Sequence, residues 1–188
     1  MEQLQGRKAL ITGGGRGLGK ATALALAAEG VDVAITGRNE DALLETVAAL
    51  QAFGVKAIHS VFDVTNLEDV KRGISYITEA FGHIDILINN AGIIKRIPLL
   101  EMEVADFREV IDIDLVSPFI VSKHVAKGMI DRRQGKIINI CSMMSELGRN
   151  TVSAYAAAKG GLKMLTKNMA TEWAKYNVQI NGIGPGYF

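Results

Sequence analysis

The stretch KALITGGGRGLGKATALALAAEG, residues 8–30, contains an apolar segment, a glycine cluster and an alanine-rich helical pattern in immediate succession. The apolar segment predicts a buried strand over 8–12, and the alanine-rich segment predicts a helix over 17–29. The glycines between them allow a tight turn and close approach of backbone N–H groups to a diphosphate, and the helix adds the positive end of its dipole. A glycine cluster alone is a weak signal, but its position between strand and helix predicts a phosphate-binding loop.

The same alternation of apolar segments and helical patterns continues along the chain. We expect strands at 8–12, 31–36, 56–62, 84–88, 136–141 and 179–183, and helices at 17–29, 40–53, 67–81, 104–132 and 152–176. The strands are nearly continuously apolar, which predicts burial on both faces and hence a parallel sheet in an α/β fold. We expect Gly30, Gly54, Gly82 and Gly135 to end four helices, and Pro118 to bend the fourth.

The composition is that of a globular protein. Of 188 residues, 48% are hydrophobic and 22% charged, and only 3 are proline, which excludes a disordered chain. The net charge is +1 without a basic stripe, so we expect no nucleic-acid partner. The single cysteine, Cys141, needs no oxidising compartment, and no apolar segment is long enough for a signal peptide or a membrane span. We therefore expect a cytoplasmic protein without membrane contact. The histidines lie on separate elements, so no metal site is expected.

The residues with the clearest chemistry follow the ends of the expected strands. In chain order these are residues 13–19, Arg38, Asp63 and Val64, residues 89–92, Ser142, and Pro185 and Gly186. Because the carboxyl ends of parallel strands lie at one edge of a sheet, the sequence predicts a single ligand-binding crevice there.

The residues after the second strand indicate which dinucleotide fits. A carboxylate there would bind the adenosine ribose diol, but the sequence has Arg38 and no acid until Glu40. Arg38 fits a 2′-phosphate, which Arg16 of the glycine loop can also approach, so we expect NADP(H) to be favoured over NAD(H). The alternative is that both arginines are solvated surface charges. Asp63 is expected either to accept from an adenine amine or to cap the following helix.

Tyr155 and Lys159 are four residues apart on an expected helix, so they share a face, and Ser142 ends the preceding strand. The Lys159 ammonium favours the phenolate of Tyr155, which can then exchange a proton with a substrate oxygen. Ser142 can donate a hydrogen bond to the same oxygen. This combination is suited to hydride transfer between a secondary alcohol and a ketone.

Five motifs in this order resemble the short-chain dehydrogenase/reductase family. They are Thr12-Gly13-x-x-x-Gly17-x-Gly19, Asn89-Asn90-Ala91-Gly92, Ser142, Tyr155-x-x-x-Lys159 and Asn181-x-x-x-Pro185-Gly186. The resemblance implies a Rossmann-type, doubly wound parallel sheet of six strands in the order 3-2-1-4-5-6 and a nicotinamide cofactor. It also implies that Ser142 orients the substrate, that Tyr155 is the acid/base, and that Lys159 binds the nicotinamide ribose. The resemblance further implies that the fourth and fifth helices pack against a second copy of the chain, in a homodimer or homotetramer.

Together, these motifs and the strand-end residues form the expected cofactor site. Its residues are Gly13, Gly15, Arg16, Gly17, Leu18, Gly19, Arg38, Asp63, Val64, Asn90, Ala91, Gly92, Tyr155, Lys159, Pro185 and Gly186. The resemblance implies that Asn89 to Gly92 support the sheet and line the cofactor, and that Pro185 and Gly186 face the nicotinamide.

The chain departs from the family pattern in two places. Family members commonly have an asparagine in the fourth helix, which holds a water of the proton relay, whereas this chain has Asp114. A carboxylate accepts but cannot donate, so we expect Asp114 to hold a water and to pair electrostatically with Lys159. The chain also stops at Phe188, before the substrate lid and seventh strand of relatives. We therefore expect one domain over 1–188, truncated at its C-terminus.

The substrate is indicated by a further resemblance. The stretches 140–149, 90–96 and 182–187 are similar to gluconate 5-dehydrogenases, whereas the first half is more similar to β-ketoacyl-carrier-protein reductases. A sugar acid needs a cation for its carboxylate and polar partners for its hydroxyls, for which Arg96, Arg149, Glu146 and Ser145 are candidates. The favoured pair is gluconate and 5-ketogluconate. The alternatives are a β-ketoacyl substrate and a dinucleotide-binding protein without catalytic activity.

Overall fold

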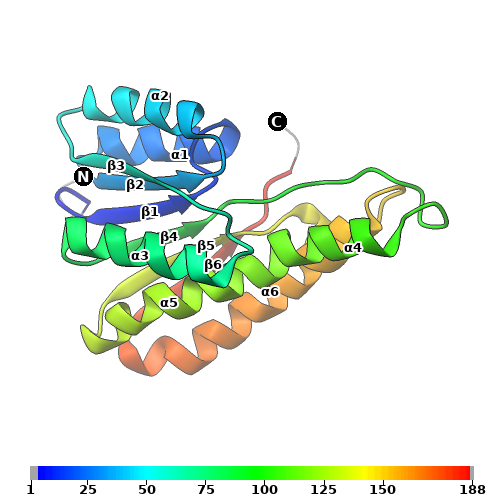
Figure 1. The fold of residues 1–188 in the computed structure, drawn as a ribbon. Coiled ribbons are helices and arrows are strands. Elements are labelled where there is room, and N and C mark those ends of the chain that lie inside the picture. Colours follow the sequence, from blue (N-terminus) through cyan, green and yellow to red (C-terminus); the bar gives the residue numbers. More distant parts are fainter. Residues whose placement is uncertain (1–3, 187–188) are drawn as a thin grey trace.

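The computed structural model describes residues 4–186, in which six parallel strands form one sheet in the order β3-β2-β1-β4-β5-β6 (Figure 1). The strands are β1 (Lys8–Thr12), β2 (Asp32–Gly37), β3 (Ala57–Val61), β4 (Ile86–Asn89), β5 (Gly135–Ile140) and β6 (Val178–Ile183). Each lies within two residues of its predicted position. The predicted α/β fold and strand order are therefore confirmed. Tyr187, part of one stretch used for the substrate prediction, lies outside the described residues.

The helices cover both faces of the sheet, α1 and α2 on one side and α3, α5 and α6 on the other (Figure 1). Their bounds are α1 (Gly17–Ala28), α2 (Glu40–Gln51), α3 (Leu67–Phe81), α4 (Val104–Ile111), α5 (Ser117–Asp131) and α6 (Ser153–Trp173). A π-helical segment, η1 (Asp112–Val116), and two 3₁₀ segments, η2 (Met143–Ser145) and η3 (Ala174–Tyr176), complete the set. Among residues 4–186, no helix has the length and apolarity needed to cross a lipid bilayer.

Two apolar clusters hold the helices against the sheet. Neighbouring residues of β1 point to opposite faces, so Leu10 packs in the cluster under α3, α5 and α6, and Ile11 packs in the cluster under α1 and α2. Burial on both faces, predicted for all strands, is wrong for β6, and it also fails at Lys136 of β5 and Val61 of β3, which are exposed. Val178 and Ile180 are buried, but Gln179 is exposed because this edge strand is covered on one face.

The predicted helix over 104–132 is divided into α4, η1 and α5. Pro118, the second residue of α5, has no N–H for the carbonyl one turn before it, so regular α-helical hydrogen bonding is interrupted there. Hydrogen bonds of a π segment span five residues and widen the helix locally. The Ser117 hydroxyl donates to the carbonyl oxygen of Ile113 at 2.6 Å. Asp114 therefore lies in the middle of a widened turn.

Three of the four predicted helix-ending glycines follow helices as expected. Gly30, Gly54 and Gly82 have φ values of 79°, 77° and 79°, which favour glycine. The prediction is wrong for Gly135, which begins β5, while Arg133 takes the left-handed conformation after α5 with a φ of 53°. A Cβ at Gly135 would lie 2.4 Å from the sulfur of Met129, so close packing requires this glycine.

A chain of buried amide and hydroxyl groups joins β4, β5, α5 and α6. Asn89 Nδ2 donates to Ser122 Oγ and to Asn139 Oδ1, both at 2.8 Å. Asn139 Nδ2 donates in turn to Thr166 Oγ1 at 2.8 Å. Because hydrogen bonds between buried groups are directional, these contacts fix the strands that carry Asn90 and Ser142 against the helix that carries Tyr155.

Candidate active site

The loop between β1 and α1 brings its backbone close to the carboxyl edge of the sheet. Gly13 and Gly17 have φ values of 67° and 54°. A Cβ at Gly19 would lie 2.2 Å from the carbonyl oxygen of Gly13, so helix and loop are in backbone contact. The first turn of α1 has neither a side-chain cap nor an acidic residue. Its N–H groups and dipole are therefore available to an anion.

The first turns of α2 and α3 differ from that of α1. Asn39 caps α2, Asn66 caps α3, and both helices have acidic residues in the first turn. The alternative role predicted for Asp63, capping α3, is wrong because Asn66 occupies that position. The Asp63 Oδ1 instead accepts from the backbone N and Oγ1 of Thr65 at 2.9 and 2.7 Å.

Asn90 ties the loop after β4 to the glycine loop. Its Nδ2 donates to the carbonyl oxygens of Thr12 and Gly13 at 2.9 and 3.2 Å. The Thr12 hydroxyl oxygen accepts from the backbone N of Asn90 and of Ala91, each at 3.0 Å. These four bonds hold two segments of the crevice together, although they are distant in sequence.

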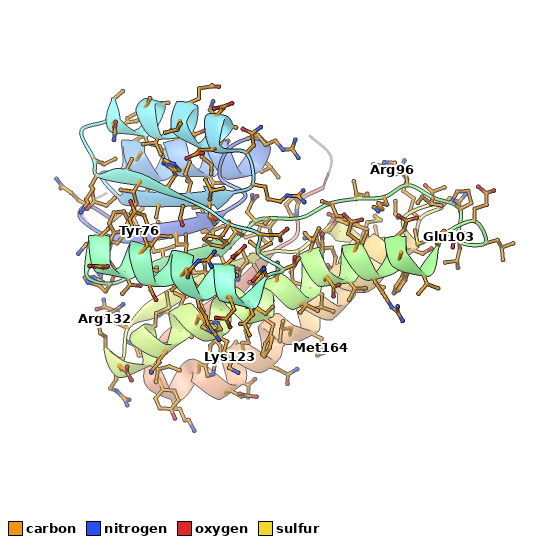
Figure 2. All side chains as sticks on the ribbon, in the orientation of Figure 1. Tyr76, Arg96, Glu103, Lys123, Arg132 and Met164 are labelled. Carbon is orange, nitrogen blue, oxygen red and sulfur yellow. The ribbon has the colours of Figure 1, made fainter. Side chains whose placement is uncertain are left out.

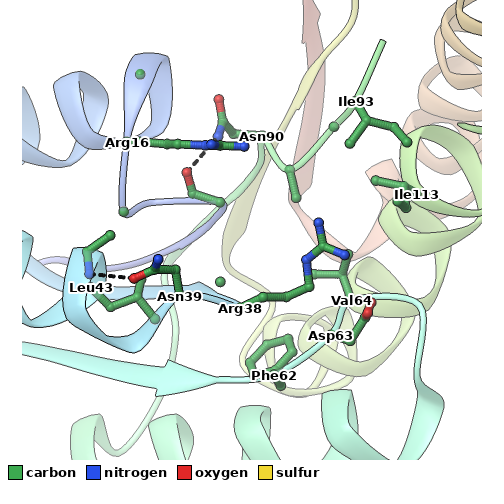
Figure 3. A pocket seen from close by; sticks show the side chains of 17 residues that line it. Arg16, Arg38, Asn39, Leu43, Phe62, Asp63, Val64, Asn90, Ile93 and Ile113 are labelled. Atoms are coloured by element: carbon green, nitrogen blue, oxygen red, sulfur yellow. Dashed lines mark hydrogen bonds between the residues drawn. The ribbon is translucent and has the colours of Figure 1, made fainter. Parts of the chain in front are cut away.

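A cavity of about 570 Å³ lies between the loops that follow β1 to β4 (Figure 3). This volume is within the range of about 300–1,000 Å³ found for small-molecule sites. Ten residues predicted to bind the cofactor line it: Gly13, Gly15, Arg16, Gly17, Arg38, Asp63, Val64, Asn90, Ala91 and Gly92. The structure thus brings together the loops that the sequence assigned to one crevice.

Six residues predicted for the cofactor site do not line this cavity: Leu18, Gly19, Tyr155, Lys159, Pro185 and Gly186. Leu18 is 46% exposed, and Gly19 is buried behind the glycine loop. Pro185 and Gly186 lie near the loop after β5, where the carbonyl of Pro185 accepts from Met143 N at 3.2 Å. The same loop contains Ser142.

Seven further residues line the cavity without having been predicted: Gly37, Asn39, Ala42, Leu43, Phe62, Ile93 and Ile113. Phe62 directly follows β3 and Ile93 follows the Asn90 segment, so their places after strand ends were a usable signal. Leu43 comes from α2 and Ile113 from η1. The sequence contains no signal for these two, because only helix packing brings them to the edge.

Arg16 and Arg38 are exposed side chains that extend into the cavity from the loops after β1 and β2 (Figure 3). Partial burial acts to raise the pKa of Asp63, but the Thr65 hydrogen bonds and the Arg38 charge together lower it. Arg38 therefore lies close enough to the loop after β3 to stabilise the Asp63 carboxylate.

Lys159 and Tyr155 lie on one face of α6, as their spacing predicts. The Lys159 Nζ is buried, donates to the carbonyl oxygen of Ile140 at 2.8 Å, and lies 5.5 Å from the centroid of the Tyr155 ring. It also lies 3.2 Å from Oδ2 of Asp114. The ammonium thus has the phenol on one side and a carboxylate on another.

Asp114 is fully buried beside the cavity wall. Its Oδ1 accepts from the backbone N of Ile93 at 2.7 Å. A Cβ at Gly92 would lie 2.8 Å from Oδ2, so glycine leaves room for the carboxylate. Burial raises the pKa of Asp114, while the charge of Lys159 and the N–H of Ile93 act to lower it. Asp114 and Lys159 form a buried ion pair.

Ser142 follows β5, and its Oγ accepts from Met144 N at 3.1 Å. The Ser145 hydroxyl donates to the carbonyl oxygen of Lys159 at 2.9 Å and accepts from Ser142 N at 3.3 Å. Ser145 therefore connects the Ser142 loop to the turn of α6 that carries Lys159. Its proton is already used within the protein, so Ser145 could meet a substrate hydroxyl only as an acceptor.

The remaining residues predicted for the substrate lie on exposed loops outside the cavity. Arg96 is on the long loop from β4 to α4, away from the sheet (Figure 2). Ile97 N donates to the carbonyl oxygen of Thr151 at 2.9 Å, so this loop runs beside the one that carries Arg149. Glu146 forms an ion pair with Lys163 of α6.

Across residues 4–186, no group of three or more His, Cys, Asp or Glu side chains has an arrangement that could hold a metal ion. The charged residues that line the cavity are Arg16, Arg38 and Asp63, and Asp114 and Lys159 form an ion pair beside it.

Comparison with known proteins shows what the chain is similar to. It is 61% identical over 186 residues to a 2-dehydro-3-deoxy-D-gluconate 5-dehydrogenase of Formosa agariphila, which covers 98% of this chain and 70% of the relative. The crystal structure of a gluconate 5-dehydrogenase from Burkholderia cenocepacia, in complex with NADP and tartrate, matches with a TM-score of 0.93 and 46% identity, covering 98% of this chain and 72% of that one.

A NAD⁺-bound xylitol dehydrogenase matches with a TM-score of 0.96 and 37% identity, covering 98% of this chain and 72% of that one. The model of the family described as short chain dehydrogenase matches residues 7–188. The resemblance drawn from the five motifs is confirmed. The chain therefore belongs to the short-chain dehydrogenase family and is an oxidoreductase that acts on CH–OH groups.

Proposed function

We propose that this protein interconverts a secondary alcohol and a ketone of an open-chain sugar acid, with NADP(H) as hydride carrier and gluconate and 5-ketogluconate as the first candidate pair. We base this on one observation. The Tyr155–Lys159 pair is linked through Ser145 to the Ser142 loop, and the Asp114 carboxylate joins Lys159 to Ile93, which lines the cavity that contains Arg16 and Arg38.

The residues that line the cavity fit a phosphorylated dinucleotide. The backbone of residues 13–17 and the uncapped first turn of α1 would hold the diphosphate. Arg16 and Arg38 would hold the 2′-phosphate. Asp63 and Val64 would contact the adenine, and the Asp63 Oδ2 would accept from its amine, since Thr65 uses Oδ1.

Further residues would hold the other end of the cofactor. Asn90, Ala91 and Gly92 would line its middle, Lys159 and Tyr155 would bind the nicotinamide ribose, and Pro185 and Gly186 would face the nicotinamide. Leu18 would cover the diphosphate, and Gly19 would allow the close helix contact already described. A bound nicotinamide supplies the hydride to the carbonyl carbon or accepts it from the alcohol carbon.

The protein's own groups would carry the proton. In ketone reduction, the Tyr155 phenol donates its proton to the carbonyl oxygen, and the Ser142 hydroxyl donates a hydrogen bond to the same oxygen. In alcohol oxidation, the Tyr155 phenolate removes the hydroxyl proton. The Lys159 ammonium beside the ring favours the phenolate. Asp114 would hold this ammonium in place, and it would also bind a water of the proton path.

A sugar acid as substrate is supported by the names of two similar proteins and by charges near the site. The Formosa and Burkholderia proteins are named as dehydrogenases of gluconate or a deoxygluconate at carbon 5. Arg96 and Arg149 lie on adjacent exposed loops and are the candidates to bind the carboxylate.

The test is a spectrophotometric assay of NADPH formation or consumption. We expect turnover with gluconate and NADP⁺, and with 5-ketogluconate and NADPH. 2-Dehydro-3-deoxygluconate tests the related sugar acid, and a 3-oxoacyl thioester tests the β-ketoacyl alternative. If the protein turns over only the thioester, the substrate is a β-ketoacyl compound and not a sugar acid. Saturable NADPH binding without turnover of any member of the panel would favour a non-catalytic binding protein.

A further inference from the structure

Asp114 has a negative charge in direct contact with the lysine that supports Tyr155. We propose that Asp114 is a positioning residue whose charge offsets the effect of the Lys159 ammonium on Tyr155, and that it thereby raises the pH at which Tyr155 becomes a proton acceptor. This inference rests on the acid/base role proposed for Tyr155, and it adds control of the working pH to that role.

The geometry places the three groups in sequence. The Lys159 Nζ lies 5.5 Å from the centroid of the Tyr155 ring and 3.2 Å from Asp114 Oδ2. The side chains of Asp114 and Lys159 are 0% and 5% exposed, so solvent does little to screen them. Oδ2 accepts no hydrogen bond from the described residues, which leaves its charge directed at the ammonium.

An isolated ammonium next to a phenol favours the phenolate, because opposite charges attract. A carboxylate in contact with that ammonium turns the single charge into an ion pair, whose field falls off more steeply with distance. Tyr155 should therefore need a higher pH to lose its proton than it would beside Lys159 alone. An asparagine would keep an acceptor for Ile93 N but remove the negative charge.

Other charged groups nearby are already paired. Lys163, one turn along α6, pairs with Glu146, and Lys95 of the loop after β4 pairs with Asp106 and Glu109 of α4.

Among the described residues, a further titratable group near Lys159 is Cys141, which directly follows β5. Burial raises the pKa of the Cys141 thiol, although the charge of Lys159 acts to lower it, so this thiol ionises less readily than an ordinary cysteine. Asp114 is therefore the acid positioned to act on Tyr155 through Lys159.

The experiment is a pH titration of the Tyr155 phenolate by its near-ultraviolet absorbance, without cofactor or substrate. The chain has 4 tyrosines, so each protein is measured against its own Tyr155→Phe version and the difference isolates Tyr155. We expect Asp114→Asn to move the midpoint down by about one pH unit, the lower end of the effect of one nearby charge. The acid limb of the kcat profile should move in the same direction.

The matched control is Asp106→Asn. It also removes a carboxylate, but Asp106 pairs with Lys95 and not with Lys159, so this variant should leave the midpoint of the Tyr155 titration unchanged. Asp114→Ser removes the same charge with a smaller side chain and replaces the amide variant if that variant does not unfold cooperatively. A midpoint that stays or rises in the folded Asp114 variant overturns the inference. The titration needs no turnover, so it can succeed or fail independently of the sugar-acid assignment.

Discussion

Tyr155 has a hydroxyl group proposed to act in catalysis and an aromatic ring that packs against apolar side chains. The ring contacts the cluster formed by Val110, Ala154 and Ala158, and the side chain is only partly buried. Removing the hydroxyl therefore leaves the apolar packing in place. At the scale of this residue, chemistry and stability can be changed separately.

We expect Tyr155→Phe to lower kcat by at least about 100-fold, the usual contribution of a general acid/base, and to leave cofactor binding nearly intact, because Lys159 still binds the ribose. Lys159→Ala should lower both kcat and affinity, since it loses the ribose contact as well. Steady-state kinetics and fluorescence titration with NADPH measure the two effects. The control is Tyr176→Phe in η3, which should retain full activity; a Tyr155→Phe enzyme above about one hundredth of normal activity would contradict the assignment.

We expect the choice of cofactor to depend most directly on Arg38. It extends into the cavity from the loop after β2, which has no acid before Glu40. We expect the protein to bind NADPH more tightly than NADH, and Arg38→Asp to weaken NADPH at least about tenfold while sparing NADH, since a charge-assisted hydrogen bond is lost. Fluorescence titration measures both. Arg108→Asp, an exposed change on α4, is the control, and equal affinity of the unaltered protein for both cofactors would refute the preference.

At the scale of elements, α1 and the glycine loop are in direct backbone contact, with no side chain between them. A Cβ at Gly19 would lie 2.2 Å from Gly13 O and 2.5 Å from Asn90 Nδ2, and the carbonyl cannot move as a flexible side chain can. We expect Gly19→Ala to lower the free energy of unfolding by about 1–3 kcal/mol and to weaken cofactor binding.

Urea denaturation and NADPH titration test this prediction. Gly148 has nothing within 4 Å of its Cβ position, so Gly148→Ala is the matched control and should change the free energy of unfolding by less than about 0.5 kcal/mol. An unchanged stability and affinity in Gly19→Ala would show that the loop adjusts to the methyl group.

The interrupted helix after β4 shows how backbone hydrogen bonding divides an element that apolar periodicity predicts to be continuous. The apolar periodicity of 104–132 continues across Pro118, so the pattern predicts one helix. The missing N–H of Pro118 is compatible with a π segment, and that segment brings Asp114 and Ile113 to the site. The pattern of backbone hydrogen bonds determines where the helix is interrupted, and apolar periodicity does not encode that pattern.

At the scale of the whole molecule, α5 and α6 retain apolar side chains on their outer surface. Phe119 is 46% and Met164 is 54% exposed, and Figure 2 shows Met164 and the neighbouring Lys123 at the outer surface of the helices. We propose that a second copy of the chain covers this surface, as the resemblance implies for the fourth and fifth predicted helices. Apolar side chains of this size are typical of the centre of an interface.

We expect the combined change Phe119→Glu and Met164→Glu to lower the assembly mass measured by size-exclusion chromatography with light scattering, because buried unpaired charges oppose association. Leu44→Glu on α2, where Leu44 is 49% exposed, is the control and should leave the mass unchanged. A monomeric unaltered protein at the same concentration would exclude the proposed interface.

The sequence by itself determined the order of strands and helices, the phosphate loop and the Tyr155–Lys159 pair. These features depend on local properties: apolar periodicity, glycine between strand and helix, and a spacing of four residues that places side chains on one helix face. Parallel strands then bring their carboxyl ends to one edge, so ten lining residues could also be predicted.

Only the tertiary structure decided the entry of Leu43 and Ile113 into the cavity wall and the use of Ser145 as a link to α6. It also placed Arg96 on an exposed loop outside the cavity. Each depends on how separate elements pack. The packing of the helices against the sheet determines the distance between side chains on different elements, and a local sequence pattern does not encode that distance.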